Sequence, residues 1–303
     1  MGMIKLEDIT FKEATEVAEG NEQLFEEMID KLRQWLQQQI HLPQEISNKR
    51  LQRTILTSKF NLEKAKKRID SLYTLRALIP EFFANFDPLG DDITQFHKSL
   101  QMTPLPKLTP EKYRVIFVQV WKDASMFSLS NMMKYFYMLM DVRTEEDMVN
   151  SDIAIWDCTN FTLAHVLKFT PNLLKKCDLS MEAYGIRYKA IYMINSPSYI
   201  DQFVKLIKMF MSPKFYDRIH VFESGIESLK GIIPKSILPA DFGGEELSLD
   251  TLTDMWCAKL KEKRDWLIEQ EKLKANESLR SDGVINPDEL FGVAGIFRKL
   301  EIE

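Results

Sequence analysis

Four short runs rich in β-branched and aromatic residues, separated by long gaps, constrain the fold of this chain more than any other feature. They lie at residues 113–120, 152–157, 186–194 and 219–222. Each gap is long enough for a helix, and strands that alternate with helices usually pair in parallel as βαβ units. The sequence therefore predicts an α/β unit at residues 111–247, built on a mostly parallel sheet.

A different pattern precedes this unit. Residues 11–40, 47–58 and 61–83 place apolar side chains at helical spacing, and Asn61 provides a cap for the third of these helices. Together the three segments predict a small helical unit at residues 1–86.

Two further segments flank the α/β unit. Residues 87–110 are rich in proline and glycine, which predicts a connector with one short helix near residues 93–100. Residues 247–275 have the pattern of a charged helix, which begins a C-terminal segment at 248–303 that we expect to pack on the body. The apolar residues expected to hold its end in place are Leu290, Phe291, Val293, Ile296 and Phe297.

The composition is that of a globular protein. With 303 residues, 45% hydrophobic and 28% charged, the chain can bury a large core. It contains no apolar run long enough to span a membrane, and its first residues lack the apolar stretch of a signal peptide. The cysteines Cys158, Cys177 and Cys257 are far apart in the sequence, which disfavours a disulfide framework or a zinc site. We expect a cytoplasmic protein and a monomer.

Motifs that indicate catalysis are missing from the sequence. The four histidines are isolated, and no GxGxxG, GxxxxGK[ST] or GxSxG motif occurs. Asp123 and Asp157 follow two predicted strands and could form an acid pair, but capping and turn roles are more common for such aspartates. We predict no metal site, no catalytic residue, no cofactor and no nucleic-acid partner, and hence a protein that is not an enzyme.

Residues 186–218 combine an apolar helix face with an excess of positive charge. After the strand comes a turn, where Ser198 can cap a helix that continues to Met211. The stretch carries six basic and two acidic residues, a formal charge of +4 in a chain of −5. This combination is attracted to membrane surfaces, although an ordinary helix packed on a sheet has the same periodicity. The apolar face consists of Ile200, Phe203, Val204, Ile207, Phe210 and Met211.

Methionine is concentrated in the α/β unit. Ten of the fifteen methionines lie between residues 126 and 211. Because methionine fills irregular space and lines adaptable surfaces, this pattern is compatible with a cavity for a flexible apolar guest. A well-filled core has the same composition, and the sequence leaves both interpretations open.

Three motifs make the chain resemble the CRAL-TRIO lipid-transfer family. The segment ILTSKFNLEKA at residues 55–65 is similar to the family's N-terminal helical signature. Residues 152–157, followed by the segment FTP at 169–171, resemble the core strand and the helix after it. The loop LPADFGGEE at residues 238–246 is close to the family's LPxEYGGEE. The resemblance covers roughly residues 40–275.

The resemblance implies a helical N-terminal domain and an α/β domain whose sheet forms the floor of a hydrophobic pocket. A mobile helical lid at residues 198–211 would close this pocket. In the family's tocopherol carriers small serines stand at the positions of Phe136 and Met140, so tocopherol is not a safe choice of ligand. The implied pocket residues are Met133, Phe136, Tyr137 and Met140 on one helix, Trp156 and Ile191 on the sheet, and Phe203, Val204, Ile207, Phe210 and Met211 on the lid.

The resemblance also implies a phosphoinositide site beside the lid. Four positions that bind phosphatidylinositol bisphosphate in the family are basic in this chain as well. Each basic residue adds about 1 kcal/mol near an anionic surface, so four together favour binding roughly a thousandfold. The residues are Arg187, Lys189, Lys214 and Arg218. The arginine of the family's N-terminal signature is replaced here by Ser58.

Two functions follow from the resemblance. The first is a non-enzymatic intracellular carrier that binds a small hydrophobic ligand, such as a lipid, a retinoid or tocopherol. It would exchange this ligand at phosphoinositide-containing membranes and be reversibly peripheral to them. The second is a phosphoinositide-dependent trafficking adaptor whose bound lipid is structural. Transfer of ligand between vesicles would separate the two hypotheses.

Overall fold

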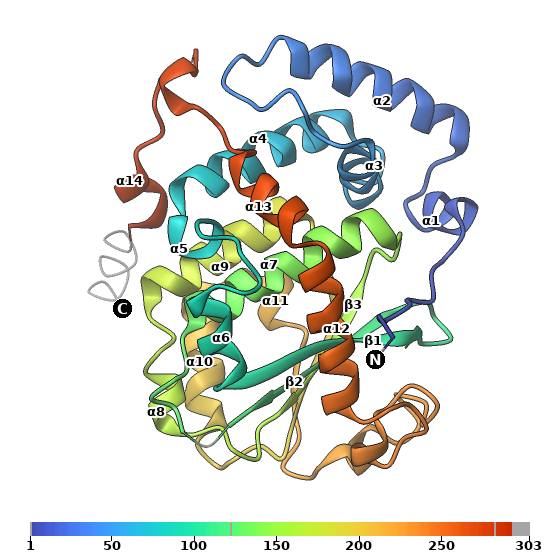
Figure 1. The fold of residues 1–303 in the computed structure, drawn as a ribbon, viewed down its shortest axis with the longest axis vertical. Coiled ribbons are helices and arrows are strands. Elements are labelled where there is room, and N and C mark those ends of the chain that lie inside the picture. Colours follow the sequence, from blue (N-terminus) through green and yellow to red (C-terminus); the bar gives the residue numbers. More distant parts are fainter. Residues whose placement is uncertain (1, 122, 282, 293–303) are drawn as a thin grey trace.

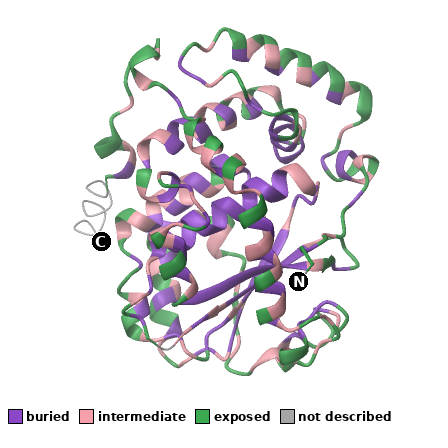
Figure 2. Cartoon of the chain, in the orientation of Figure 1, coloured by how far each residue is buried: buried purple, intermediate pink, exposed green. Residues whose placement is uncertain are grey.

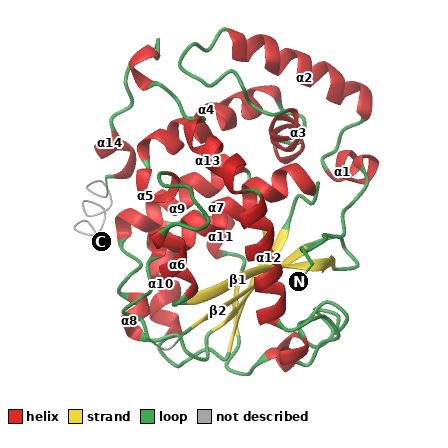
Figure 3. Ribbon diagram, viewed as in Figure 1, coloured by secondary structure: helices red, strands yellow, loops and turns green. Residues whose placement is uncertain are grey.

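A five-stranded sheet occupies the lower half of the molecule, and the N-terminal helices gather at the upper end (Figure 1). The computed structural model describes residues 2–121, 123–281 and 283–292. Figure 3 shows helices on several sides of the sheet. The strands are β1 (Leu100–Leu108), β2 (Arg114–Val120), β3 (Asp152–Asp157), β4 (Tyr188–Ile194) and β5 (Ile219–Val221).

Helices make up most of the remaining structure. Those before and around the first strand are α1 (Phe11–Val17), α2 (Glu22–Gln37), α3 (Asn48–Thr57), α4 (Leu62–Leu78), α5 (Pro80–Phe83) and α6 (Asp91–His97). Those that follow the second strand are α7 (Leu129–Glu146), α8 (Leu163–Val166), α9 (Pro171–Tyr184), α10 (Ile200–Phe210), α11 (Pro213–Tyr216), α12 (Leu249–Glu262), α13 (Arg264–Lys272) and α14 (Pro287–Phe291).

The sheet has the strand order β1-β2-β3-β4-β5, which confirms the prediction of a mostly parallel α/β domain. Among the described strands, β2 to β5 pair in parallel and β1 runs antiparallel to its neighbour β2. Connections between neighbouring parallel strands are right-handed. From β2 to β5 each connection steps in the same direction across the sheet, and the connecting helices therefore lie on one face. This topology puts α7, α9 and α10 on the same face.

Strand β1 corrects the interpretation of residues 87–110 as a connector. The short helix expected there is present as α6, but the prolines that follow it belong to an edge strand. Pro104 and Pro106 argue against a strand in the sequence, yet proline is tolerated at a sheet edge, where its missing N–H is not needed. The pairing register shifts between Pro104 and Leu108, and Leu105 is fully buried.

The helical unit differs from the expectation in one place. Residues 11–40, expected as a single helix, form α1 and α2 with a break between them. Glu19 adopts a positive φ of 65° there, and a Cβ on Gly20 would overlap the ring of Phe60. The predicted cap of α4 is confirmed, because the side chain of Asn61 accepts a hydrogen bond from the Lys64 backbone N–H.

Buried ion pairs join the helical unit to α7, which lies between that unit and the sheet and is buried along most of its length (Figure 2). The Asp141 carboxylate on α7 bonds to Arg50 of α3 and to Arg76 of α4. A second carboxylate, Asp147, contacts three guanidinium groups, and none of its own surface is exposed. The sequence reading did not foresee these pairs, because charged residues are usually found at the surface.

The C-terminal segment packs across both units. The helix expected at residues 247–275 is divided into α12 and α13, and the indole Nε1 of Trp256 donates to the Pro104 carbonyl oxygen at 2.8 Å. Further on, Arg280 binds Asp70 of α4 at 2.9 Å, and the buried ring of Phe291 lies beneath Lys176 of α9. Leu290 is partly buried against the core, as expected. The remaining apolar residues expected to pack here, Val293, Ile296 and Phe297, lie outside the described residues.

Candidate functional site

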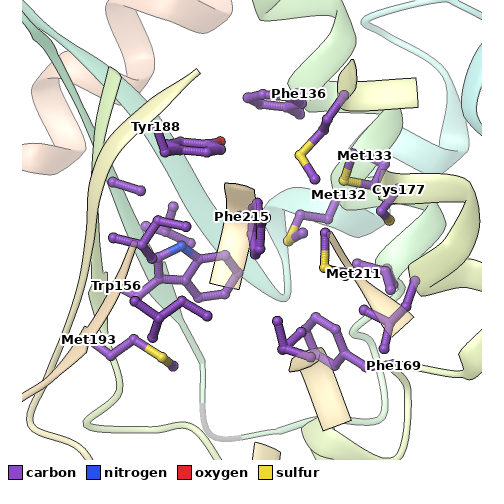
Figure 4. A pocket seen from close by; sticks show the side chains of 18 of the residues that line it. Met132, Met133, Phe136, Trp156, Phe169, Cys177, Tyr188, Met193, Met211 and Phe215 are labelled. Atoms are coloured by element: carbon purple, nitrogen blue, oxygen red, sulfur yellow. The ribbon is translucent and has the colours of Figure 1, made fainter. Parts of the chain in front are cut away.

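An apolar cavity of about 90 Å³ lies between the sheet and the helices α7, α9, α10 and α11 (Figure 4). Side chains alternate between the two faces of a strand, and alternate residues in the middle of β2, β3 and β4 line this cavity. The pairing register aligns these residues in rows across the sheet. One row is Ile116, Ala154, Ile191 and Ile219, and the other is Val118, Trp156 and Met193.

Six methionines contribute to the lining of this cavity. Figure 4 shows Met132, Met133 and Met211 on the side opposite Trp156, with the ring of Phe215 between them in this view. Met102, Met181 and Met193 complete the set. The methionine-rich sequence therefore surrounds a space that is not completely filled, and its flexible thioether side chains can adapt to different guests.

Seven of the eleven pocket residues implied by the resemblance line the cavity. They are Met133, Phe136, Trp156, Ile191, Phe203, Ile207 and Met211.

The structure places the other four pocket residues elsewhere. The Tyr137 hydroxyl bonds to Ser180 of α9, and its ring packs against Tyr184 with 4.4 Å between the ring centroids. Met140 lies one turn beyond Phe136, with its sulfur 3.5 Å from Nη1 of Arg143. Because α7 is buried on all sides, helical spacing alone could not tell which of its side chains face the cavity. The lid residues Val204 and Phe210 are also outside the lining, because the apolar face of the lid is wider than the cavity beneath it.

The helix expected as a lid is α10, and its inner face covers the cavity. Phe203 packs against the rings of Phe161 and Phe169, with centroid distances of 5.2 and 4.8 Å. The predicted cap at Ser198 is wrong, because the residue at the N-cap is Tyr199 and no side chain caps the helix. At the other end the Ser212 N–H donates to a carboxylate oxygen of Asp178 on α9, at 3.0 Å.

A second cavity, of about 360 Å³ and strongly basic, lies beside the end of the lid. All four basic residues predicted to bind phosphoinositide line it: Arg187, Lys189, Lys214 and Arg218. Lys64 and Arg68 of α4 join them from the N-terminal helical unit. The sequence analysis missed these two, although residues 64–68 of a predicted helix include four basic residues.

The cations of this cavity are poorly compensated. The guanidinium of Arg187 donates to the Thr57 carbonyl oxygen at the end of α3, and Lys189 lies 5.9 Å from the ring centroid of Tyr113. Burial and the neighbouring Arg187 lower the pKa of Arg68 to about 10. Burial, followed by the charges of Arg68, Arg187 and Lys214, also lowers the pKa of Lys64. Mutual repulsion of this kind is relieved when an anion binds among the cations.

Family comparisons identify both parts of the structure. A sequence model of the CRAL/TRIO domain matches residues 99–244, and a model of the Pinta-like UBA domain matches residues 21–93. Residues 99–244 therefore form a CRAL/TRIO domain. The CRAL/TRIO match begins just before β1, which agrees with the assignment of β1 to the sheet domain. The family is one of lipid-binding transfer proteins.

Individual CRAL/TRIO relatives are distant. The human alpha-tocopherol transfer protein-like protein is 26% identical over 225 residues, which cover 73% of this chain and 64% of the relative. Mouse clavesin-2 is 29% identical over 136 residues, 44% of this chain and 41% of the relative. The chain thus spans less than two thirds of these relatives' length. A crystal structure of Sfh5 has a TM-score of 0.49 and 13% identity, covering 84% of this chain and 98% of that one.

The two cavities of the CRAL/TRIO domain share a wall. Met181, Tyr188 and Phe215 line both of them. The rings of Tyr188 and Phe215 meet edge to face, with 5.8 Å between their centroids. Phe215 belongs to α11, which follows the lid directly, so a movement of the lid end and a movement of this wall are linked through the chain.

The two aspartates considered as an acid pair both accept hydrogen bonds from neighbouring residues. Asp123 accepts a hydrogen bond from the Ser125 N–H at 2.9 Å, a turn role. Asp157 accepts hydrogen bonds from Gln119, Thr159 and Asn195. In the described part of the chain, no group of histidine, cysteine and acidic side chains is arranged to hold a metal ion. No described helix combines the length and the apolar character needed to cross a membrane.

Proposed function

We propose that this protein is a non-enzymatic carrier, working as a monomer and without a cofactor, that exchanges a small hydrophobic ligand at phosphoinositide-containing membranes. The shared wall of Met181, Tyr188 and Phe215 supports this proposal most directly. An anionic headgroup in the basic cavity would lie against the wall of the ligand cavity, so that contact with the membrane could trigger exchange. The name of the human relative, which refers to tocopherol transfer, agrees with a carrier.

Ligand uptake requires movement of the lid. The free space of about 90 Å³ is smaller than the engineered cavities of about 150 Å³ that hold benzene, so a lipid does not fit the closed form. The chain at Met211 is extended between α10 and α11, and Pro213 begins the next helix. These residues form a hinge on which α10 can swing away from the methionines beneath it.

Apolar side chains beside the lid offer a contact with lipid. Leu163 and Leu167, at either end of α8, are 52% and 80% exposed. Phe161, which precedes them, packs against Phe203 of the lid. Lys205 and Lys208 are exposed on the outer face of the lid itself. In this proposal the protein is cytoplasmic and reversibly peripheral, with leucines entering the interface while lysines meet anionic headgroups.

Two measurements test the proposal. Organic extraction of the purified protein followed by mass spectrometry should release one dominant apolar molecule, in an amount close to that of the protein. The protein should then transfer that molecule between two vesicle populations, faster when the acceptor contains phosphoinositide. Binding to vesicles without any transfer would contradict the carrier and support the adaptor with a structural lipid.

Filling the apolar cavity should prevent ligand capture. Ala154 lies between Ile116 and Ile191 in one row of the sheet floor, and Ala154→Phe would direct a phenyl ring into the free space. We expect the affinity for a fluorescent fatty acid to fall at least about tenfold, with a stability cost of about 1–3 kcal/mol from overpacking. Met133→Leu conserves volume and should keep the affinity. Unchanged uptake by Ala154→Phe would show that the ligand binds elsewhere.

A further inference from the structure

The basic cavity is lined by residues that come from two different units of the chain. Lys214 and Arg218 lie on and just after α11, and Arg187 and Lys189 lie at the start of β4, so these four belong to the CRAL/TRIO domain. Lys64 and Arg68 lie on α4 of the N-terminal helical unit. The walls carry six cations against the two carboxylates of Asp178 and Glu182, a formal charge of +4.

The two carboxylates neutralise little of this charge. Asp178 already accepts a hydrogen bond from the Ser212 N–H. Glu182 lies 3.8 Å from Lys214, and within the described ranges this is the single ion pair formed by any of the six cations. Five cations, of which Arg68 and Arg187 are half-buried, therefore face the cavity without an ionic partner in the described ranges.

Arg68 is held in place by neutral acceptors. Its Nη1 donates to the hydroxyl oxygens of Ser58 and Thr57 at 3.1 and 3.3 Å, and its Nε donates to the Glu182 carbonyl oxygen at 3.1 Å. Its Nη2 has no hydrogen-bond partner among the residues that the structure describes. The Arg68 guanidinium thus contacts Ser58, the position at which the family's N-terminal signature has an arginine. The Nη2 atom of Arg68 remains available to an anion.

The geometry points to Lys64 and Arg68 as specificity residues that recognise a second phosphate, so that the cavity prefers an inositol headgroup with at least two phosphates over one with a single phosphate. One phosphate would bind Lys214 and Arg218, and another would reach α4 across the cavity. A volume of about 360 Å³ is within the usual range of ligand pockets and exceeds the space that a single phosphate needs. This inference rests on the proposed function and adds that the headgroup bridges the two units.

The test compares vesicles that contain phosphatidylinositol monophosphate or bisphosphate at equal total surface charge. For K64Q/R68Q we expect binding to bisphosphate vesicles to weaken about thirtyfold, with less than about threefold change for monophosphate vesicles. K67Q is the matched control, because Lys67 is an exposed lysine of the same helix that does not line the cavity, and it should leave both affinities unchanged. K64Q alone should weaken binding to bisphosphate vesicles about fivefold. This single variant provides the test if the double variant does not fold.

The outcomes separate this inference from the carrier proposal. If K64Q/R68Q weakens both lipids equally, or neither, Lys64 and Arg68 do not select a second phosphate, while the carrier proposal stands. If the unaltered protein binds neither phosphoinositide vesicle, the membrane part of the carrier proposal fails together with this inference. Soluble inositol bisphosphate, titrated by calorimetry, gives the remaining arm. The soluble headgroup could bind in a way that depends on Lys64 and Arg68 while the protein binds no vesicles. That result would support the role of the two residues in phosphate recognition, but it would show that the ligand is a soluble inositol phosphate and not a membrane lipid.

Discussion

Replacing Lys214 and Arg218 together by glutamate should weaken binding to phosphoinositide vesicles about a thousandfold. The two reversals change the charge beside the membrane by four units, and each unit is worth about 1 kcal/mol near an anionic surface. Both residues line the basic cavity and both are exposed, so the substitutions should not disturb the core. Vesicle sedimentation at physiological ionic strength measures the effect, and binding of a fluorescent fatty acid in solution should be unchanged.

The control for this experiment reverses the same amount of charge elsewhere. Lys31 and Lys272 are exposed on α2 and α13 and do not line the basic cavity. The variant K31E/K272E has the same net charge as K214E/R218E and should bind vesicles almost as well as the unaltered protein. Equal losses of vesicle binding in the two variants would indicate a non-specific effect of net charge. If K214E/R218E sediments with vesicles as well as the unaltered protein does, the basic cavity is not the membrane-binding site.

Asp141→Ala should reduce the free energy of unfolding by about 3–5 kcal/mol, which is a large part of the stability of a typical domain. The carboxylate is completely buried, and its two oxygens bind Arg50 of α3 and Arg76 of α4. Removing it leaves two guanidinium groups without their counter-charge at the junction between the helical unit and α7. Urea unfolding followed by circular dichroism measures the change.

Two comparisons separate charge burial from a general effect of substitution. Glu269 pairs with Lys272 at the surface, so Glu269→Ala should change the stability by less than about 1 kcal/mol. Replacing Asp141, Arg50 and Arg76 together by apolar residues of similar size should recover much of the loss, because no uncompensated charge remains. A triple variant as unstable as Asp141→Ala would indicate that shape, and not charge, makes this junction stable.

Much of the fold could be predicted because the relevant signals are local. The run at residues 152–157 is a strand with the same bounds in the structure, and Asn61 caps α4 as expected. β-branched runs, helical periodicity and capping residues act within a few residues of chain, so they can be read without tertiary information. The strand β1 was missed for a related reason, since its prolines are compatible with a strand only at a sheet edge, and edge position is a property of the whole sheet.

The functional residues divide in a similar way. The resemblance to the family placed Arg187, Lys189, Lys214 and Arg218 at one site, and the structure brings all four to one cavity. Lys64 and Arg68 could not be assigned in this way, because α4 reaches the cavity only through its packing on α9. Tyr137 shows the converse, since it shares the periodic pattern of Met133 but faces α9 and not the cavity.

The sequence by itself determined which segments of this chain are strands and helices, where several of them begin, and that a basic, apolar stretch follows the third run of β-branched and aromatic residues. The tertiary structure alone decided which side of α7 lines the apolar cavity, that β1 forms one edge of the sheet, and that residues of α4 and α11 line one basic cavity. The physical reason is that periodicity records that a side chain is buried, but not which partner buries it. Partners distant in sequence are chosen by the packing of the whole chain.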